Sequence, residues 1–170
     1  MENREAKNAL YGYYKREVER RKNEFVMTDE LKQQISEVGD FLTTETRYYG
    51  LFLPGSIGNG KTTMLKAIRD LLIYLVESDR IRYCEGDKYP RFVTARDMAN
   101  IAKDADEFRS LKTTKYLILD DLCEEPAEVL SFGNYIYPFV ELLEYRYEQM
   151  LPTFISSNFG AVDIEEKYHS

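Results

Sequence analysis

The sequence has 170 residues, of which 44% are hydrophobic, and a chain of this length and composition can bury one substantial core, so it does not have the composition typical of an intrinsically disordered protein. Its formal net charge of −7 disfavours tight binding of nucleic acid by the chain alone, because neutralising phosphates requires clustered Lys and Arg. The sequence contains neither a run of about eighteen apolar residues nor an apolar segment behind its polar N-terminus, so we expect a cytoplasmic protein that does not interact with a membrane.

The first predicted element is a polar helix over residues 4–24. It has few apolar positions, so we expect it to depend on contacts with another element. The mixed-charge run at residues 15–22 is interpreted as a solvated helix face, and a DNA-contacting or partner-docking arm is the alternative. We therefore assign residues 1–27 to a polar N-terminal helix or arm.

A second helix is predicted from Thr28 to about Leu42, because Thr28 is a good N-cap and apolar residues follow at helical spacing. The rest of the chain alternates between strands and helices. Strands are predicted at 49–53, 91–94, 116–119 and 153–157, and helices at 60–76, 95–103 and 132–150, the last interrupted by Pro138. This alternation predicts an α/β fold with a mostly parallel sheet between two helical layers, and assigns residues 28–170 to one core domain.

One glycine-rich motif lies between a predicted strand and a predicted helix. Residues 55–62, Gly-Ser-Ile-Gly-Asn-Gly-Lys-Thr, fit the P-loop pattern G-x-x-x-x-G-K-[ST]. Glycines let backbone N–H groups converge on a phosphate, and the helix that follows adds its positive end. The residues expected to bind ATP are Gly55, Ser56, Ile57, Gly58, Asn59, Gly60, Lys61, Thr62 and Thr63. Lys61 is expected to reach the β- and γ-phosphates, and the Thr62 hydroxyl to bind Mg²⁺.

Polar residues also follow two other apolar strands. Asp120 ends the run Leu117-Ile118-Leu119 and is expected to hold Mg²⁺ through water, opposite Thr62. Asp121 is placed to orient or deprotonate an attacking water. Asn158 follows the strand at 153–157 and could hydrogen-bond both the γ-phosphate and that water. Lys61, Asp120, Asp121 and Asn158 are the candidate catalytic residues.

Several other residues carry weaker signals. Tyr48 and Tyr49, or Phe25 and Val26, could flank an adenine ring, although aromatic and apolar residues at such places more often pack in a core. Three nearby acids are interpreted as a solvated loop and a helix start: Glu124, Glu125 and Glu128. Cys84 and Cys123 lack metal-binding spacing and are predicted to be free thiols. His169, the one histidine, has no evident partner.

These motifs together resemble AAA+ ATPases of the DnaC/DnaI helicase-loader and IstB transposition-helper group. The most discriminating part is the run from Arg146 to Asn158, Arg-Tyr-Glu-Gln-Met-Leu-Pro-Thr-Phe-Ile-Ser-Ser-Asn, in which Asn158 matches the family's sensor-1 asparagine. The resemblance covers residues 45–168 and implies an AAA+ core, with ATP and Mg²⁺ as cofactors. It also implies ATP-dependent homo-oligomers that act on a replicative helicase, on a transposase or on single-stranded DNA.

The resemblance leaves two departures and several alternatives. The family's sequence would continue from residues 164–168 into an arginine finger and a sensor-2 lid, so we expect a truncated or degenerate member that binds ATP better than it hydrolyses it. The polar segment at residues 78–90 has no assigned role. A helicase loader is the leading expectation, and the alternatives are a transposition helper, a small-molecule kinase and a nucleotide-gated binding module.

Overall fold

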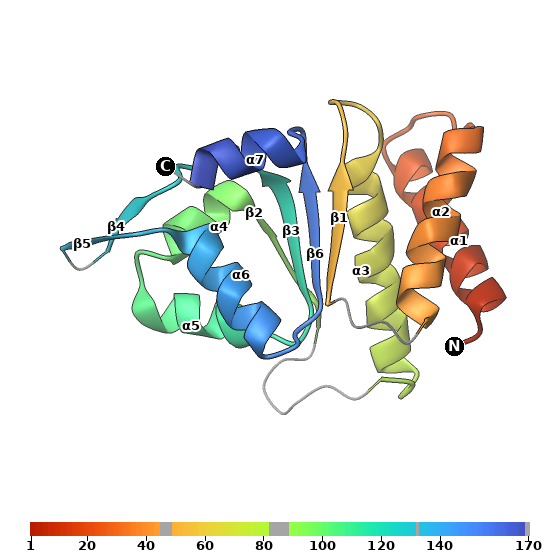
Figure 1. The fold of residues 1–170 in the computed structure, drawn as a ribbon. Helices are drawn as coiled ribbons and strands as arrows, with labels where there is room; N and C mark the ends of the chain where they lie inside the picture. The colour runs from red at the N-terminus through yellow and green to blue at the C-terminus, as the bar shows by residue number, and fades with distance from the viewer. Residues whose placement is uncertain (45–48, 82–88, 132, 169–170) are drawn as a thin grey trace.

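A four-stranded parallel sheet forms the centre of the computed structural model, which describes residues 1–44, 49–81, 89–131 and 133–168 (Figure 1). The strand order is β1-β6-β3-β2, and an antiparallel hairpin, β4–β5, projects beside it. The strands are β1 (Gly50–Pro54), β2 (Arg91–Thr94), β3 (Leu117–Leu122), β4 (Val129–Ser131), β5 (Asn134–Ile136) and β6 (Thr153–Ser157). The helices are α1 (Asn3–Arg20), α2 (Asp29–Thr43), α3 (Lys61–Glu77), α4 (Ala95–Ile101), α5 (Ala105–Thr113), α6 (Pro138–Glu148) and α7 (Ala161–Tyr168).

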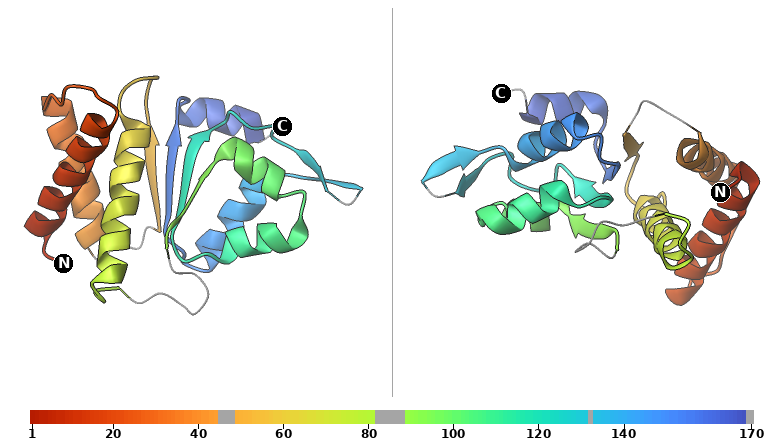
Figure 2. Two further views of the ribbon diagram at one scale, coloured as in Figure 1. Left: turned by 180° about the vertical axis from the view of Figure 1, so that it is seen from behind. Right: turned by 90° about the horizontal axis from the view of Figure 1, so that it is seen from below.

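The helices cover both faces of this sheet, which confirms the expected three-layer α/β arrangement. Figures 1 and 2 show α1, α2 and α3 gathered beside β1, and α4, α5 and α6 on the opposite side. Successive residues of β3 supply the two cores, because side chains alternate across a strand. Ile118 packs in the cluster with α1, α2 and α3, whereas Leu117 and Leu119 pack in the cluster with α4, α5 and α6.

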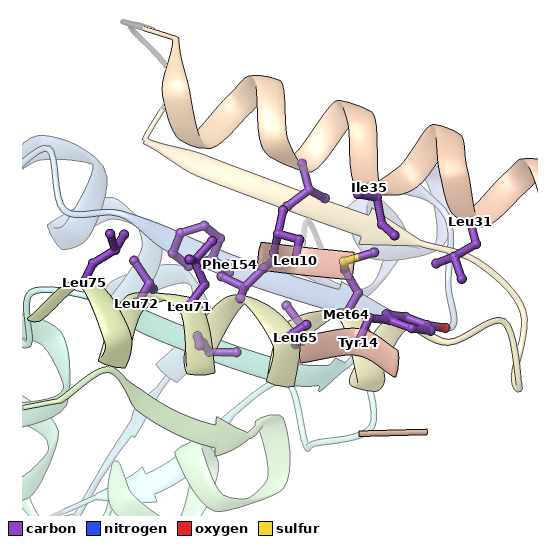
Figure 3. Packing of buried hydrophobic residues seen from close by; sticks show 14 residues of the cluster. Leu10, Tyr14, Leu31, Ile35, Met64, Leu65, Leu71, Leu72, Leu75 and Phe154 are labelled. Carbon is purple, nitrogen blue, oxygen red and sulfur yellow. The ribbon is translucent and has the colours of Figure 1, made fainter. Parts of the chain in front are cut away.

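Helix α1 packs along α3, as its scarcity of apolar residues led us to expect. Ala6 and Leu10 are fully buried and Tyr14 is 8% exposed. Figure 3 shows Leu10 and Tyr14 beside the side chains of Met64 and Leu65 from α3. Burying a side chain the size of leucine contributes roughly 1.5–3 kcal/mol, so these few anchors are enough to hold a polar helix in place.

Helix α2 begins as predicted. The Thr28 hydroxyl accepts a hydrogen bond from the Leu31 backbone N–H at 3.1 Å, and Asp29 and Glu30 lie in the first turn, where acidic side chains suit the helix dipole. Leu31, Ile35 and Val38 of this helix are buried against α1 and α3.

The prediction of a helix over 132–150 is wrong in its first third. Residues 134–136 form strand β5, and α6 begins only at Pro138. Proline has no N–H and a fixed φ, so it is unfavourable inside a helix but well suited to its first position, which is where it lies. Helices α5 and α7 and the hairpin were not predicted, although Asp104 caps α5 by accepting hydrogen bonds from the N–H groups of Asp106 and Glu107.

Arg146 is a fully buried arginine at the end of the sheet where β6 begins. Its guanidinium donates to the carbonyls of Thr114 at 2.6 Å and Pro152 at 2.7 Å, and to the Thr153 hydroxyl at 2.8 Å. A further hydrogen bond of 3.0 Å reaches the Lys112 carbonyl. Arg146 therefore joins α6 to the end of α5 and to the starts of β3 and β6.

Within the described segments, none of the helices combines the length and apolar character that a bilayer span requires. Cys123 is a free thiol, and burial raises its pKa above the ordinary value. Cys84 and His169 lie outside the described residues.

Candidate nucleotide-binding site

The glycine-rich loop lies between β1 and α3, the strand–loop–helix context that its motif requires. Gly58 and Gly60 have φ values of 88° and 85°, in the left-handed region that favours glycine. A Cβ atom on Gly60 would lie 2.1 Å from the Tyr14 hydroxyl of α1. At its start the loop is tied to the sheet by a hydrogen bond of 3.2 Å from the Gly55 N–H to the Ser157 carbonyl.

The Lys61 ammonium is held inside the curve of this loop. It donates to the carbonyls of Gly55 at 2.7 Å and Ser56 at 2.9 Å, and to Asn59 Oδ1 at 3.2 Å. Lys61 is 8% exposed and is the first residue of α3, so its charge adds to the positive end of a 17-residue helix. This combination of cation, helix end and glycine backbone suits a bound phosphate.

Three oxygen-bearing side chains from three elements meet next to the loop. The Thr62 hydroxyl donates to Asp120 Oδ1 at 3.1 Å, and the Ser156 hydroxyl donates to the same oxygen at 2.5 Å. Asp120 is 4% exposed at the carboxyl side of β3, where it pairs in register with Thr94 of β2. Hydroxyl and carboxylate oxygens are the ligands that Mg²⁺ prefers.

The donor set fits a cation that is shared with a phosphate. Among residues 1–44, 49–81, 89–131 and 133–168, no group of three or more His, Cys, Asp or Glu could hold a metal ion. Mg²⁺ is usually held by one or two carboxylates together with substrate phosphates, rather than by a cage of protein ligands. The pair Thr62 and Asp120 is therefore a suitable partial site for Mg²⁺.

Asp121 lies in an irregular part of β3. Its φ is 58°, its N–H donates to the Ser156 hydroxyl at 3.1 Å, and the register of β3 against β6 shifts between Leu119 and Leu122. Burial raises the pKa of the Asp121 carboxyl above its ordinary value, and the negative charges of Asp120 and Glu124 raise it further. A carboxylate with a raised pKa is a better proton acceptor than an ordinary one.

Asn158 follows β6 and contacts a residue that the sequence analysis left in a solvated loop. Its side-chain Nδ2 donates to Glu124 Oε1 at 3.3 Å, while Glu124 Oε2 lies 3.3 Å from Arg96 Nη2 on α4. Glu124 therefore belongs to the site and fixes the amide of Asn158. No motif marks this acid in the sequence, because the contact depends on where α4 begins and β6 ends.

A cavity of about 900 Å³ joins these groups. The glycine-rich loop, Asp121, Glu124 and Asn158 line one part of it, and the connection between α1 and α2 lines the other. Phe25 and Val26 of this connection are at the cavity together with Tyr14, whose ring lies 6.4 Å from that of Phe25, edge to face.

Tyr49 lies away from this cavity. It lines a separate hollow of about 320 Å³ with Phe41 and Phe154, so the interpretation of Tyr49 as a residue beside adenine is not supported, and Tyr48 lies outside the described residues. Glu125 is buried rather than solvated, since it is 4% exposed beneath α7.

A family model described as the bacterial DnaA ATPase domain matches residues 13–127, which is more than half of the chain. The chain belongs to this family. The matched stretch begins within α1 and includes the glycine-rich loop, Asp120 and Asp121. It ends before Asn158, so the place of Asn158 in the site rests on the geometry above and on the sequence resemblance.

Relatives of this DnaA-type ATPase domain agree with the resemblance seen in the sequence. The replicative helicase loader DnaI of Bacillus subtilis is 35% identical over 124 residues, which cover 70% of the chain and 36% of DnaI. The chain thus spans about a third of that curated relative. A putative primosome component from Streptococcus pyogenes serotype M3 superposes with a TM-score of 0.62 and 25% identity, covering 85% of this chain and 71% of that one. A crystal structure of DnaI superposes with a TM-score of 0.59 and 26% sequence identity, covering 85% of this chain and 74% of the DnaI chain.

These similarities confirm the prediction that the chain is an AAA+ protein of the DnaC/DnaI type. They also place its fold among P-loop NTPase cores. The roles of individual residues in this site are inferred from the chemistry of the cavity.

Proposed function

We propose that the protein binds ATP together with Mg²⁺ in the 900 Å³ cavity and uses the bound nucleotide to control a replicative helicase, as a helicase loader. The observation that carries the proposal is the meeting of Lys61, Thr62, Asp120, Asp121 and Asn158 at one edge of the sheet. The relation to DnaI supports the choice of partner.

The phosphate half of the site is built from the loop and α3. Backbone N–H groups of residues 55–62 would bind the phosphate chain, and Lys61 would exchange its carbonyl acceptors for β- and γ-phosphate oxygens. Thr62 and Asp120 would hold the metal, which when bound neutralises charge on the phosphates. Thr63, the next residue of α3, is buried and is also proposed to belong to the nucleotide-binding residues.

The base half of the site is proposed to be the connection between α1 and α2. Phe25 and Val26 offer apolar contacts at the cavity, and the Tyr14 ring extends this surface towards Gly60. Aromatic side chains bind the flat face of a purine well.

Hydrolysis is proposed to depend on two side chains at the polar end. Asp121 would orient the attacking water and take up its proton, and Asn158 would hold the water and the γ-phosphate once its amide leaves Glu124. Asn158 Nδ2 donates to Glu124 Oε1 at 3.3 Å, so the amide must exchange this acceptor before it can act, and we expect slow hydrolysis by the chain alone.

The nucleotide arm of the test is a titration with a fluorescent ATP analogue and Mg²⁺. Lys61→Ala is expected to weaken binding by about tenfold or more, because a charge-assisted hydrogen bond to phosphate is worth about 1.5–3 kcal/mol. Lys103→Ala is the matched control, since Lys103 is exposed and, within the described part of the chain, its ammonium donates only to Asn100 Oδ1, at 3.0 Å. Equal affinities of the wild type and Lys61→Ala would refute the proposed site.

The partner arm is an affinity capture from host lysate with ATP and Mg²⁺, followed by mass spectrometry. Recovery of a replicative helicase by the wild type, and not by Lys61→Ala, is expected. Recovery of a transposase instead would favour a transposition helper, and transfer of phosphate to a metabolite would favour a kinase. Assembly of the wild type into ATP-dependent oligomers, and any binding of single-stranded DNA, can be read in the same samples. The expected partner also implies that the protein acts in the cytoplasm.

A further inference from the structure

The backbone that follows Asp120 is held in an uncommon shape. Asp121 and Cys123 have φ values of 58° and 78°, the left-handed region that non-glycine residues rarely adopt. They lie on either side of Leu122, where the register of β3 against β6 is shifted. The direction of the Asp121 carboxyl therefore depends on contacts that keep this bulge from relaxing to a regular strand.

Some of these contacts come from the neighbouring strand β6. The Ser156 hydroxyl accepts a hydrogen bond from the Asp121 N–H at 3.1 Å, and the Ser157 hydroxyl donates to the Leu122 carbonyl at 2.7 Å. They fix the first half of the bulge. They leave the Cys123 carbonyl and the residues after it to another element.

That other element is α7, through Lys167. The Lys167 ammonium donates to the Cys123 carbonyl at 2.6 Å and to the Glu125 carbonyl at 2.5 Å. It also lies 3.8 Å from the Glu125 carboxylate, which is buried and accepts a hydrogen bond from the Tyr168 hydroxyl. The second oxygen of Glu125 has no hydrogen-bond partner among the described residues. Lys167 thus binds the backbone carbonyls at the end of the bulge and also provides a positive charge near the buried Glu125 carboxyl.

The position of α7 connects this contact to the rest of the site. The helix begins at Ala161, a few residues after Asn158, and the Tyr168 ring packs 4.9 Å from that of Phe139 on α6. The segment that carries Asn158 is therefore anchored at its far end on the same loop that carries Asp121. Lys167 fixes where these two side chains lie relative to each other.

We propose that Lys167 is a positioning residue for ATP hydrolysis, which acts through the carbonyls of Cys123 and Glu125 to hold the Asp121 bulge in place at the cavity. The proposal rests on the proposed function, because it names a residue that supports the hydrolytic step of that site. Lys167 does not line the cavity and is not expected to touch the nucleotide.

The test compares Lys167→Met with the wild type in steady-state ATP hydrolysis and in nucleotide titration. We expect kcat to fall by about tenfold to a hundredfold, since a displacement of about 1 Å at a reacting group can cost that much. The dissociation constant for ATP is expected to stay within about twofold, because the glycine-rich loop is untouched. Lys167→Arg, whose guanidinium can reach the same carbonyls, should recover most of the loss. Glu166→Gln, an exposed neighbour on the same helix, is the control.

A second measurement is independent of activity. In hydrogen exchange without nucleotide, Lys167→Met should speed exchange of the amides in residues 121–125 and leave α1, α2 and α3 unchanged. Unchanged exchange of this loop would overturn the proposal. So would an unchanged kcat, or equal losses in kcat, ATP affinity and thermal stability, which would indicate a structural role only. A wild type that never hydrolyses ATP would refute the proposed hydrolysis instead, and the exchange experiment would still decide whether Lys167 holds the loop.

Discussion

Replacing Glu17 should destabilise the end of α1 and remove its ion pair with Lys66 of α3. The Glu17 carboxylate is 5% exposed and receives hydrogen bonds from Arg20 at 2.9 Å and Arg21 at 3.1 Å, while Lys66 of α3 lies at 3.3 Å. Its pKa is lowered from 4.5 to about 2, first by Arg20 and then by Arg21 and Lys66. At 1.36 kcal/mol per pKa unit this difference corresponds to about 3 kcal/mol. Arg20 is exposed and screened by solvent, so we expect Glu17→Gln to cost about 2 kcal/mol at pH 7.

The pH dependence gives the decisive measurement. A carboxyl whose pKa is lowered by folding stabilises the protein fully above its unfolded pKa of 4.5, and this contribution is lost as the pH falls towards about 2. Urea unfolding of the wild type and Glu17→Gln, followed by circular dichroism, should therefore give curves that approach each other between pH 5 and about pH 3. Glu19→Gln is the control, because Glu19 is 55% exposed with Lys15 at 3.8 Å. A difference that stays constant over this range, or that is absent at pH 7, would refute the reasoning.

Three further predictions test other parts of the structure. Arg146→Met should lower the free energy of unfolding, measured in urea, by about 3–5 kcal/mol, because it leaves buried carbonyls without donors. Arg109→Met, at an exposed position, should change it by less than about 0.5 kcal/mol. Equal effects of the two substitutions would contradict the role of Arg146 as a buried hydrogen-bond donor. Gly60→Ala should weaken ATP binding in calorimetry by about tenfold, and addition of Tyr14→Phe should recover only part of this, because the clash is relieved but the positive φ remains. Burial raises the pKa of Asp121 above its ordinary value of 3.8, so the rate of ATP hydrolysis should decrease as the pH is lowered and this carboxylate becomes protonated. A rate that does not change with pH would exclude Asp121 as the base.

The grouping of the residues at the proposed phosphate end of the site could be predicted because most of them are neighbours in the sequence. The strand, the glycines, Lys61 and Thr62 follow one another directly, and Asp120 ends an apolar run with the length of a buried strand. Parallel strands bring such ends together at one edge of a sheet. The alternation of strands and helices predicted the layers for the same reason.

The parts that could not be predicted depend on contacts between distant segments. Glu124 belongs to the site only because α4 and Asn158 approach it, and Lys167 matters only because α7 folds back over residues 123–125. The hairpin before α6 was missed because apolar residues on both sides of a proline resemble an interrupted helix. Local spacing cannot decide between those alternatives.

The buried guanidinium of Arg146 fixes the register of β6 in the sheet. It binds the carbonyl of Pro152 and the hydroxyl of Thr153, and so determines which residue of β6 comes first against β1 and β3. A slip of one residue along a strand moves its side chains by about 3.3 Å and turns each to the opposite face. Ser156 would then point away from Asp120, and Asn158 would miss the cavity. One arginine at the far end of the strand thus sets the alignment on which the proposed phosphate chemistry depends, which gives a physical reason for the place of Arg146 in the motif that ends at Asn158.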